Sequence, residues 1–205
     1  MKQIILVIIL FSLTSCSFLM KKWGGIKDPK IETLESITEY SKTLTIDTAL
    51  IAFAKDSTSL MQINNFFVGS PEILIFNSAK KHLPYKADGI ACNASVDYTL
   101  QNVCRMNANE IMSKRLINYD SLISCLDDPN NCISNLDITT FDYVVFLNFA
   151  KYFDGVNKTH IIPWNKIINE YKIDCKVKYI YVNIDYIKSW GLKKKSLPKF
   201  RVNLF

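Results

Sequence analysis

The sequence has few glycines and histidines and lacks several well-known catalytic motifs. Its 205 residues include six glycines and two histidines. It contains no G-x-x-x-x-G-K-[ST], G-x-G-x-x-G, G-x-S-x-G or H-E-x-x-H pattern. It therefore shows no sign of a phosphate-binding loop, a dinucleotide-binding turn, a nucleophile elbow or a zinc protease helix. We expect no cofactor.

The six cysteines are never spaced as C-x-x-C. This absence removes the usual dithiol redox motif and the zinc knuckle, so no metal site is expected. Cys125 and Cys132 are the easiest pair to close, because turn residues separate them, and Cys92 and Cys104 are the next candidates. These bridges would be structural. The cysteines after Cys16 are odd in number, so at least one stays unpaired.

The N-terminus has the three parts of an export signal. Lys2 precedes the apolar run 4–11, and small residues precede Cys16. The run is much shorter than the roughly 20 residues that span a membrane. Leu13-Thr14-Ser15-Cys16 resembles the lipobox of bacterial lipoproteins, in which the cysteine thiol receives a diacylglycerol. The resemblance implies that residues 1–15 are a signal peptide and that Cys16 is the lipidated first residue of the mature protein.

Lipidation at Cys16 would attach the chain to a membrane, because each buried CH₂ contributes about 0.8 kcal/mol and two acyl chains anchor stably. The resemblance thus implies a lipid bilayer as partner and a periplasm-facing location in the cell envelope. Neither Ser17 nor Phe18 is acidic, which favours the outer membrane by analogy with lipoprotein sorting. The alternative is an ordinary cleaved signal that happens to contain a cysteine. Residues 16–30 would form the tether.

The rest of the chain is suited to a folded domain with a basic end. Hydrophobic residues make up 49% of the sequence, and the net charge is +6. We assign residues 31–190 to one domain and 191–205 to a basic tail that includes Lys193, Lys194 and Lys195. Export excludes nucleic acid as a partner. A solvated tail and contact with anionic lipid both remain open.

Hydrophobic spacing predicts alternating helices and strands before residue 87. Asp28-Pro29 is typical of a helix start, with Asp as the cap and Pro in the first turn, and this helix would run to about Leu44. Two strands are predicted at 50–54 and 72–76, with a helix that begins after Asp56 between them and a weaker strand at 83–85. Residues 87–140 are polar and look like a mostly helical, cysteine-containing insertion, with helices at 109–116 and 119–126.

The segment 143–185 predicts a strand, a helix and a second strand. Residues 143–149 are a continuous apolar run typical of a strand buried at the centre of a sheet, and residues 177–184 are predicted as the next strand. Between them we expect a loop at 151–159 and then a helix with Pro163 in its first turn. The unit is a βαβ motif, and the fold class is α/β.

These elements resemble the thioredoxin fold, a mixed sheet flanked by helices. The βαβ segment 143–185 is similar to its core, and Gly69-Ser70-Pro71 before the strand at 72–76 is similar to the proline-preceded strand of its hairpin, which implies a cis bond at Pro71. The hairpin precedes the core here, so the order would be permuted. In thioredoxins the loop after the first core strand carries the redox cysteines, whereas residues 150–159 contain none. The resemblance therefore implies no catalytic residue.

The loop 151–159 instead carries polar side chains at the carboxyl end of a parallel strand, where α/β proteins bind ligands. We predict a candidate binding cluster for a small anion or a peptide end, formed by Asp154, Asn157, Lys158, Thr159 and His160. The alternative is ordinary loop and capping chemistry.

Three functions follow from these expectations. The leading hypothesis is a membrane-anchored, non-catalytic binding or scaffold module of the cell envelope, whose partner is an unidentified envelope protein. The first alternative is a thiol–disulfide oxidoreductase that uses displaced cysteines in 92–132. The second is a small-ligand carrier with a deep apolar pocket between the sheet and the insertion.

Overall fold

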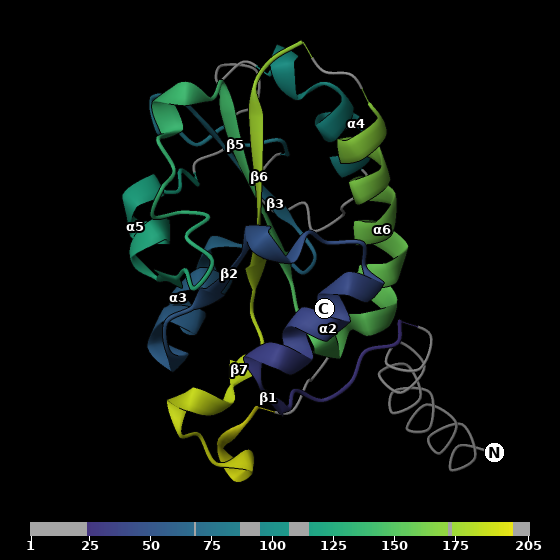
Figure 1. Ribbon diagram of the computed structural model, residues 1–205, viewed down its shortest axis with the longest axis vertical. Coiled ribbons are helices and arrows are strands. Elements are labelled where there is room, and N and C mark those ends of the chain that lie inside the picture. The colour runs from purple at the N-terminus through teal and green to yellow at the C-terminus, as the bar shows by residue number, and fades with distance from the viewer. Residues whose placement is uncertain (1–23, 68, 87–94, 107–114, 172–173, 199–205) are drawn as a thin grey trace, which may run out of the picture.

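A mixed five-stranded sheet lies at the centre of the molecule (Figure 1). The computed structural model describes residues 24–67, 69–86, 95–106, 115–171 and 174–198. The strand order is β3-β5-β6-β2-β4, and the strands are β2 (Ile51–Ala54), β3 (Ile73–Asn77), β4 (Leu126–Asp127), β5 (Tyr143–Phe149) and β6 (Val177–Asn183). β5, β6 and β2 are parallel, and β3 and β4 run antiparallel at the two edges. The predicted α/β class is confirmed.

Strands β5 and β6 form the central pair of the sheet and agree with the strands predicted at 143–149 and 177–184. They pair in register from Tyr143 opposite Val177 to Phe149 opposite Asn183. Residues 144–149 are all buried. A parallel strand that is covered on both faces favours a continuous run of apolar side chains, which is why the sequence predicted this pair well.

Helices cover both faces of the sheet (Figure 1), and each face has its own apolar core. One core contains side chains from α3 (Ser57–Phe66) and α5 (Tyr119–Ser124). The other contains side chains from α2 (Leu34–Thr43), α4 (Val96–Gln101) and α6 (Asp154–Glu170). Trp164 of α6 is fully buried in this second core.

The start of the domain differs from the helix predicted at Asp28. Ile31–Glu32 instead form the short strand β1, which pairs in parallel with β7 (Tyr186–Ile187). Helix α2 begins at Leu34, because Thr33 and Ser36 exchange side-chain to backbone hydrogen bonds as a capping box. The capping box at Thr33, and not the Asp28-Pro29 pair, therefore marks the start of the first helix.

Helix α6 is longer than predicted, and the expected loop at 151–159 is wrong. A single 3₁₀ turn, η4 (Lys151–Phe153), leads directly into α6 at Asp154. Polar residues here resemble a loop in sequence, but Asp154 and Lys158 form an i,i+4 ion pair on the helix. Pro163 therefore lies inside the helix rather than in its first turn.

The segment 87–140 is less purely helical than predicted. It contains α4 and α5, but Leu126 and Asp127 form β4, which extends the central sheet beside Ala54 and Phe53. This strand ends the predicted helix 119–126 at Ser124. Most of the predicted helix 109–116 lies outside the described residues.

The hairpin that follows Pro71 is shorter than predicted. The Ser70–Pro71 peptide bond is cis, as the resemblance implied. After β3, the expected strand at 83–85 is reduced to one bridge between Phe76 and His82.

Neither predicted cysteine pairing is present. Cys104 forms a disulfide with Cys175, across a sequence separation of 71 residues, so it is not bonded to Cys92, which lies outside the described residues. Cys125 and Cys132 are buried free thiols. Asp128 organises the turn between them, accepting hydrogen bonds from the backbone N–H groups of Cys132, Ile133 and Ser134. Hydrogen bonds to the Asp128 carboxylate therefore stabilise this turn, for which the sequence predicted a disulfide.

We predict that replacing Cys104 and Cys175 together by serine lowers the free energy of unfolding by about 4 kcal/mol, because the bridge closes a long loop of the unfolded chain. Urea unfolding measures this loss. Replacing Cys125 and Cys132 by alanine is the control, and it should cost less. Peptide mapping without reductant should recover linked peptides that contain Cys104 and Cys175. Linked peptides containing Cys125 and Cys132 would contradict the assignment.

Candidate functional site

The carboxyl ends of β5 and β6 meet at one edge of the sheet. Phe149 and Asn183 are paired there, and Lys151 and Asp185 follow them in the chain. In α/β proteins this edge is where ligands bind, because the loops that leave the strands converge. The chemistry of the site begins with these two charged residues.

Asp185 is a buried carboxylate that joins the two strand ends. The residue as a whole is only 1% exposed to solvent. Both carboxylate oxygens accept the backbone N–H of Lys151, at 2.9 and 3.1 Å, and one also accepts an N–H of the Asn183 amide at 2.8 Å. Burial raises the pKa of Asp185 to about 6, against the opposing effect of these donors. Asp185 therefore changes its charge state near pH 6.

Glu32 connects the N-terminal segment to the same edge. Its carboxylate forms an ion pair with the Lys151 ammonium at 2.6 Å and accepts the Ser36 hydroxyl at 2.8 Å. The side chains of Lys151 and Glu32 are 25% and 16% exposed, so this pair is partly shielded from water. The Lys27 N–H also donates to the Tyr152 carbonyl at 2.7 Å. Residues 27–32 are thus fastened across the strand ends.

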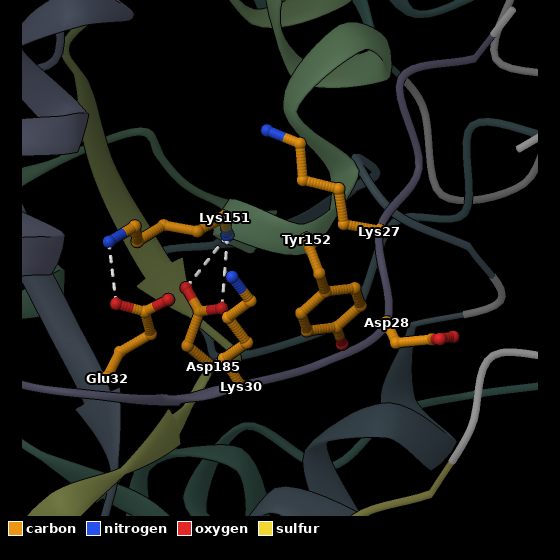
Figure 2. Close-up of a pocket in the computed structure, with 7 residues that line it drawn as sticks. All are labelled: Lys27, Asp28, Lys30, Glu32, Lys151, Tyr152 and Asp185. Carbon is orange, nitrogen blue, oxygen red and sulfur yellow. Dashed lines mark hydrogen bonds and ion pairs between the residues drawn. The ribbon is translucent and has the colours of Figure 1, made fainter. Parts of the chain in front are cut away.

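Together these groups enclose a cavity of about 200 Å³ (Figure 2). It is lined by Lys27, Asp28, Lys30, Glu32, Lys151, Tyr152 and Asp185. Figure 2 shows the ion pair between Lys151 and Glu32 and the hydrogen bonds from the Lys151 backbone to Asp185, with Tyr152 drawn beside them. Burial raises the pKa of Tyr152 well above its usual value, so the phenol stays neutral. The cavity therefore presents charges of both signs around one aromatic ring.

The structure does not bring the five predicted binding residues together. All lie on α6. Asp154 pairs with Lys158 and, at 3.6 Å, with Lys27 at the rim of the cavity. Asn157 is buried and donates to the Ala150 carbonyl at 2.6 Å and to the Tyr40 hydroxyl at 3.0 Å.

The other two predicted residues, Thr159 and His160, make contacts within helix α6. The Thr159 hydroxyl donates to the Gly155 carbonyl one turn earlier, at 2.9 Å. The ring centroid of His160 lies 5.6 Å from that of Trp164. The helix keeps Asp154 and Lys158 together as an ion pair, whereas Asn157, Thr159 and His160 make their contacts elsewhere.

Sequence reasoning missed Asp185, Glu32 and Lys30 as site residues. A signal was present for Asp185, because an acidic residue directly after a buried strand lies at the carboxyl edge of the sheet. No local signal pointed to Glu32, which reaches the site only through the pairing of β1 with β7.

The free thiols and the buried histidine are poorly suited to catalysis. Burial, together with the carboxylate of Asp128 that accepts its S–H, raises the pKa of Cys132 to about 12. Cys125 is buried and donates to the Gln62 side chain. His82 is buried, and burial lowers its pKa to about 4. Among the described residues no group of His, Cys, Asp and Glu could hold a metal ion.

Comparison of the chain with models of known protein families, with curated proteins and with solved structures found no match. Within the described residues, no helix combines the length and the apolar character that crossing a membrane requires.

We predict that Asp185 makes stability fall as the pH rises from about 4 to about 6. Its pKa is raised in the folded state, so the folded protein binds the proton more tightly than the unfolded chain, and this contribution is complete at low pH and lost above the folded pKa. The gap from 3.8 to about 6 corresponds to about 3 kcal/mol. Asp185→Asn should remove this decline, measured by urea unfolding at a series of pH values.

Asp137→Asn is the matched control. Hydrogen bonds from Thr139 lower the pKa of Asp137. The stability that Asp137 contributes is therefore lost only as the pH falls below the usual pKa of a carboxyl group. This variant should keep the decline between pH 4 and 6. Parallel profiles for Asp185→Asn and the parent protein would refute the assignment to Asp185.

Proposed function

We propose that this chain is a lipid-anchored protein of the bacterial cell envelope, facing the periplasm on the outer membrane. Its domain acts as a thioredoxin-like binding module that does not carry out redox catalysis. The partner is another envelope protein, bound at the charged cavity between the ends of β5 and β6. The observation that carries the proposal is this cavity, which stands where a thioredoxin would present cysteines.

The anchor is supported by the sequence before the described domain. The lipobox-like Leu13-Thr14-Ser15-Cys16 follows a short apolar run. The residues that follow Cys16 would act as the tether, since an extended chain spans up to about 3.5 Å per residue.

The thioredoxin-like arrangement is supported by part of the sheet order. β5, α6 and β6 form a parallel βαβ unit, and β3 lies antiparallel beside β5. The turn after β5 and the first residue of α6 correspond to the place of the redox cysteines in that family. Here they are Lys151, Tyr152, Phe153 and Asp154.

The size and charge of the cavity favour a protein partner. Small-molecule sites enclose roughly 300–1,000 Å³ and are mostly apolar. This cavity has about 200 Å³ and is lined by six charged residues besides Tyr152. It can take a single side chain or a chain end, with Lys27 and Lys30 exposed at the rim for complementary charges.

The two alternative functions have less support. A thiol–disulfide enzyme needs an accessible thiolate of low pKa, whereas Cys132 has a raised pKa, Cys125 is buried and Cys104 is bonded to Cys175. A ligand carrier needs an apolar pocket, and the cavity between the strand ends is charged.

We predict that a photo-crosslinking amino acid in place of Lys30, in the full chain in intact bacterial cells, yields one defined adduct with another protein. The same group in place of Lys81, an exposed lysine in the turn after β3, is the control and should not yield that adduct. Gel analysis and mass spectrometry identify both products.

A second test of the proposal reverses one charge at the rim of the cavity. Lys27→Glu should lower the yield of the Lys30 adduct several-fold, because reversing a rim charge weakens complementary encounter. The proposal fails if Lys30 gives no adduct, if both positions give the same adducts, or if Lys27→Glu leaves the yield unchanged.

A further inference from the structure

The end of the chain is basic and lacks compensating acids. No acidic residue follows Asp185, whereas lysines stand at positions 188, 193, 194 and 195 in the described part. This part contains two 3₁₀ turns, η5 (Lys188–Trp190) and η6 (Lys194–Ser196). We refer to residues 188–198 as the basic segment.

The basic segment is fastened to the domain. The Trp190 ring packs against the Tyr186 ring with an interplanar angle of 75° and a centroid distance of 6.5 Å. Gly191 then turns the chain in a left-handed conformation, with φ of 67°. The yellow segment in Figure 1 projects from the end of the molecule where β1 and β7 lie. The lysines are therefore held on a projection of defined position.

The lysines of η6 and its flank are exposed and not neutralised. Lys193, Lys194 and Lys195 are all exposed, and none of the ion pairs within the described ranges includes them. Lys188 differs, because Glu35 of α2 lies within electrostatic reach of it. Three adjacent positive charges therefore face solvent.

The N-terminal segment passes the base of the basic segment. Residues 27–32 are fastened to the domain, and within them β1 pairs in parallel with β7, so Ile31 lies opposite Tyr186 and Glu32 opposite Ile187. The basic segment begins directly after β7. An anchor at Cys16 would therefore be joined to the domain through a segment that contacts the base of the basic segment.

We infer that the basic segment is a second membrane contact, which binds the anionic headgroups of a phospholipid bilayer through Lys193, Lys194 and Lys195. The choice of a bilayer as partner rests on the proposed anchoring at Cys16. Clusters of lysine beside a membrane attachment bind anionic lipid, because their positive charges are attracted to the negative headgroups.

The test uses the chain from residue 16 onward with Cys16→Ser, so that no acyl chain contributes and every described residue is kept. Co-sedimentation should show binding to phosphatidylcholine vesicles with about a third of phosphatidylglycerol, and weak binding to phosphatidylcholine alone. Added salt should weaken the binding, because screening shortens the reach of the charges. This outcome is independent of whether cells acylate Cys16.

A triple variant isolates the lysines. Lys193→Gln, Lys194→Gln and Lys195→Gln together should weaken binding to the anionic vesicles about a hundredfold, since each lysine near such a surface contributes about fivefold. The matched control is Lys42→Gln, Lys81→Gln and Lys166→Gln, which removes the same charge from exposed positions elsewhere and should change the affinity by less than about threefold. Circular dichroism checks that both variants remain folded.

Three results would overturn the inference. The first is equal binding to vesicles with and without phosphatidylglycerol. The second is equal loss of binding in the two triple variants. The third is binding to poly-glutamate as tight as binding to the vesicles, because the segment would then recognise an acidic polypeptide rather than a bilayer.

Discussion

The hydrogen bonds from the Lys151 N–H to the buried carboxylate of Asp185 are the contact on which this end of the molecule depends. They join the residues that follow β5 and β6, just before α6 begins and where the chain leaves the central sheet for β7. The side chain of the same Lys151 reaches Glu32 and so holds β1. One buried carboxylate therefore organises the cavity, the N-terminal segment and the ribbon of β1 and β7.

The proposed binding role suits the state of the groups around the cavity. Lys151 is paired with Glu32, and burial keeps the Tyr152 phenol neutral. Lys30 is exposed at the rim, and Lys27 is paired with Asp154 only at 3.6 Å, so both can meet the charges of a partner. In the proposed setting, a protein bound at this cavity would lie beside the bilayer that carries the anchor.

The sequence predicted the parts of the fold that depend on local patterns. The continuous apolar run of β5 predicted its bounds closely, because a central parallel strand is buried on both faces, and the strand predicted at 177–184 differs from β6 by one residue. Asp56 was identified as the cap of α3, and its carboxylate accepts the Ser59 N–H at 2.7 Å. Such signals lie within a few residues and are independent of the rest of the chain.

The parts that were missed depend on contacts between distant segments. The Cys104–Cys175 bridge and the pairing of β1 with β7 join residues that no local pattern relates. The start of α6 was missed because polar residues on the exposed side of a helix have the composition of a loop. The cavity was not predicted for a related reason. It lies at the strand ends, but its side chains come from three segments that are separated in the sequence.

The proposed account requires that the folded domain is held at a membrane through Cys16. The most direct measurement is the intact mass of the protein purified from the membranes of bacteria that express the full chain. The account predicts a chain that begins at Cys16 and carries the mass of a diacylglycerol on that residue. A chain that keeps residues 1–15, or one with an unmodified thiol at Cys16, would contradict it.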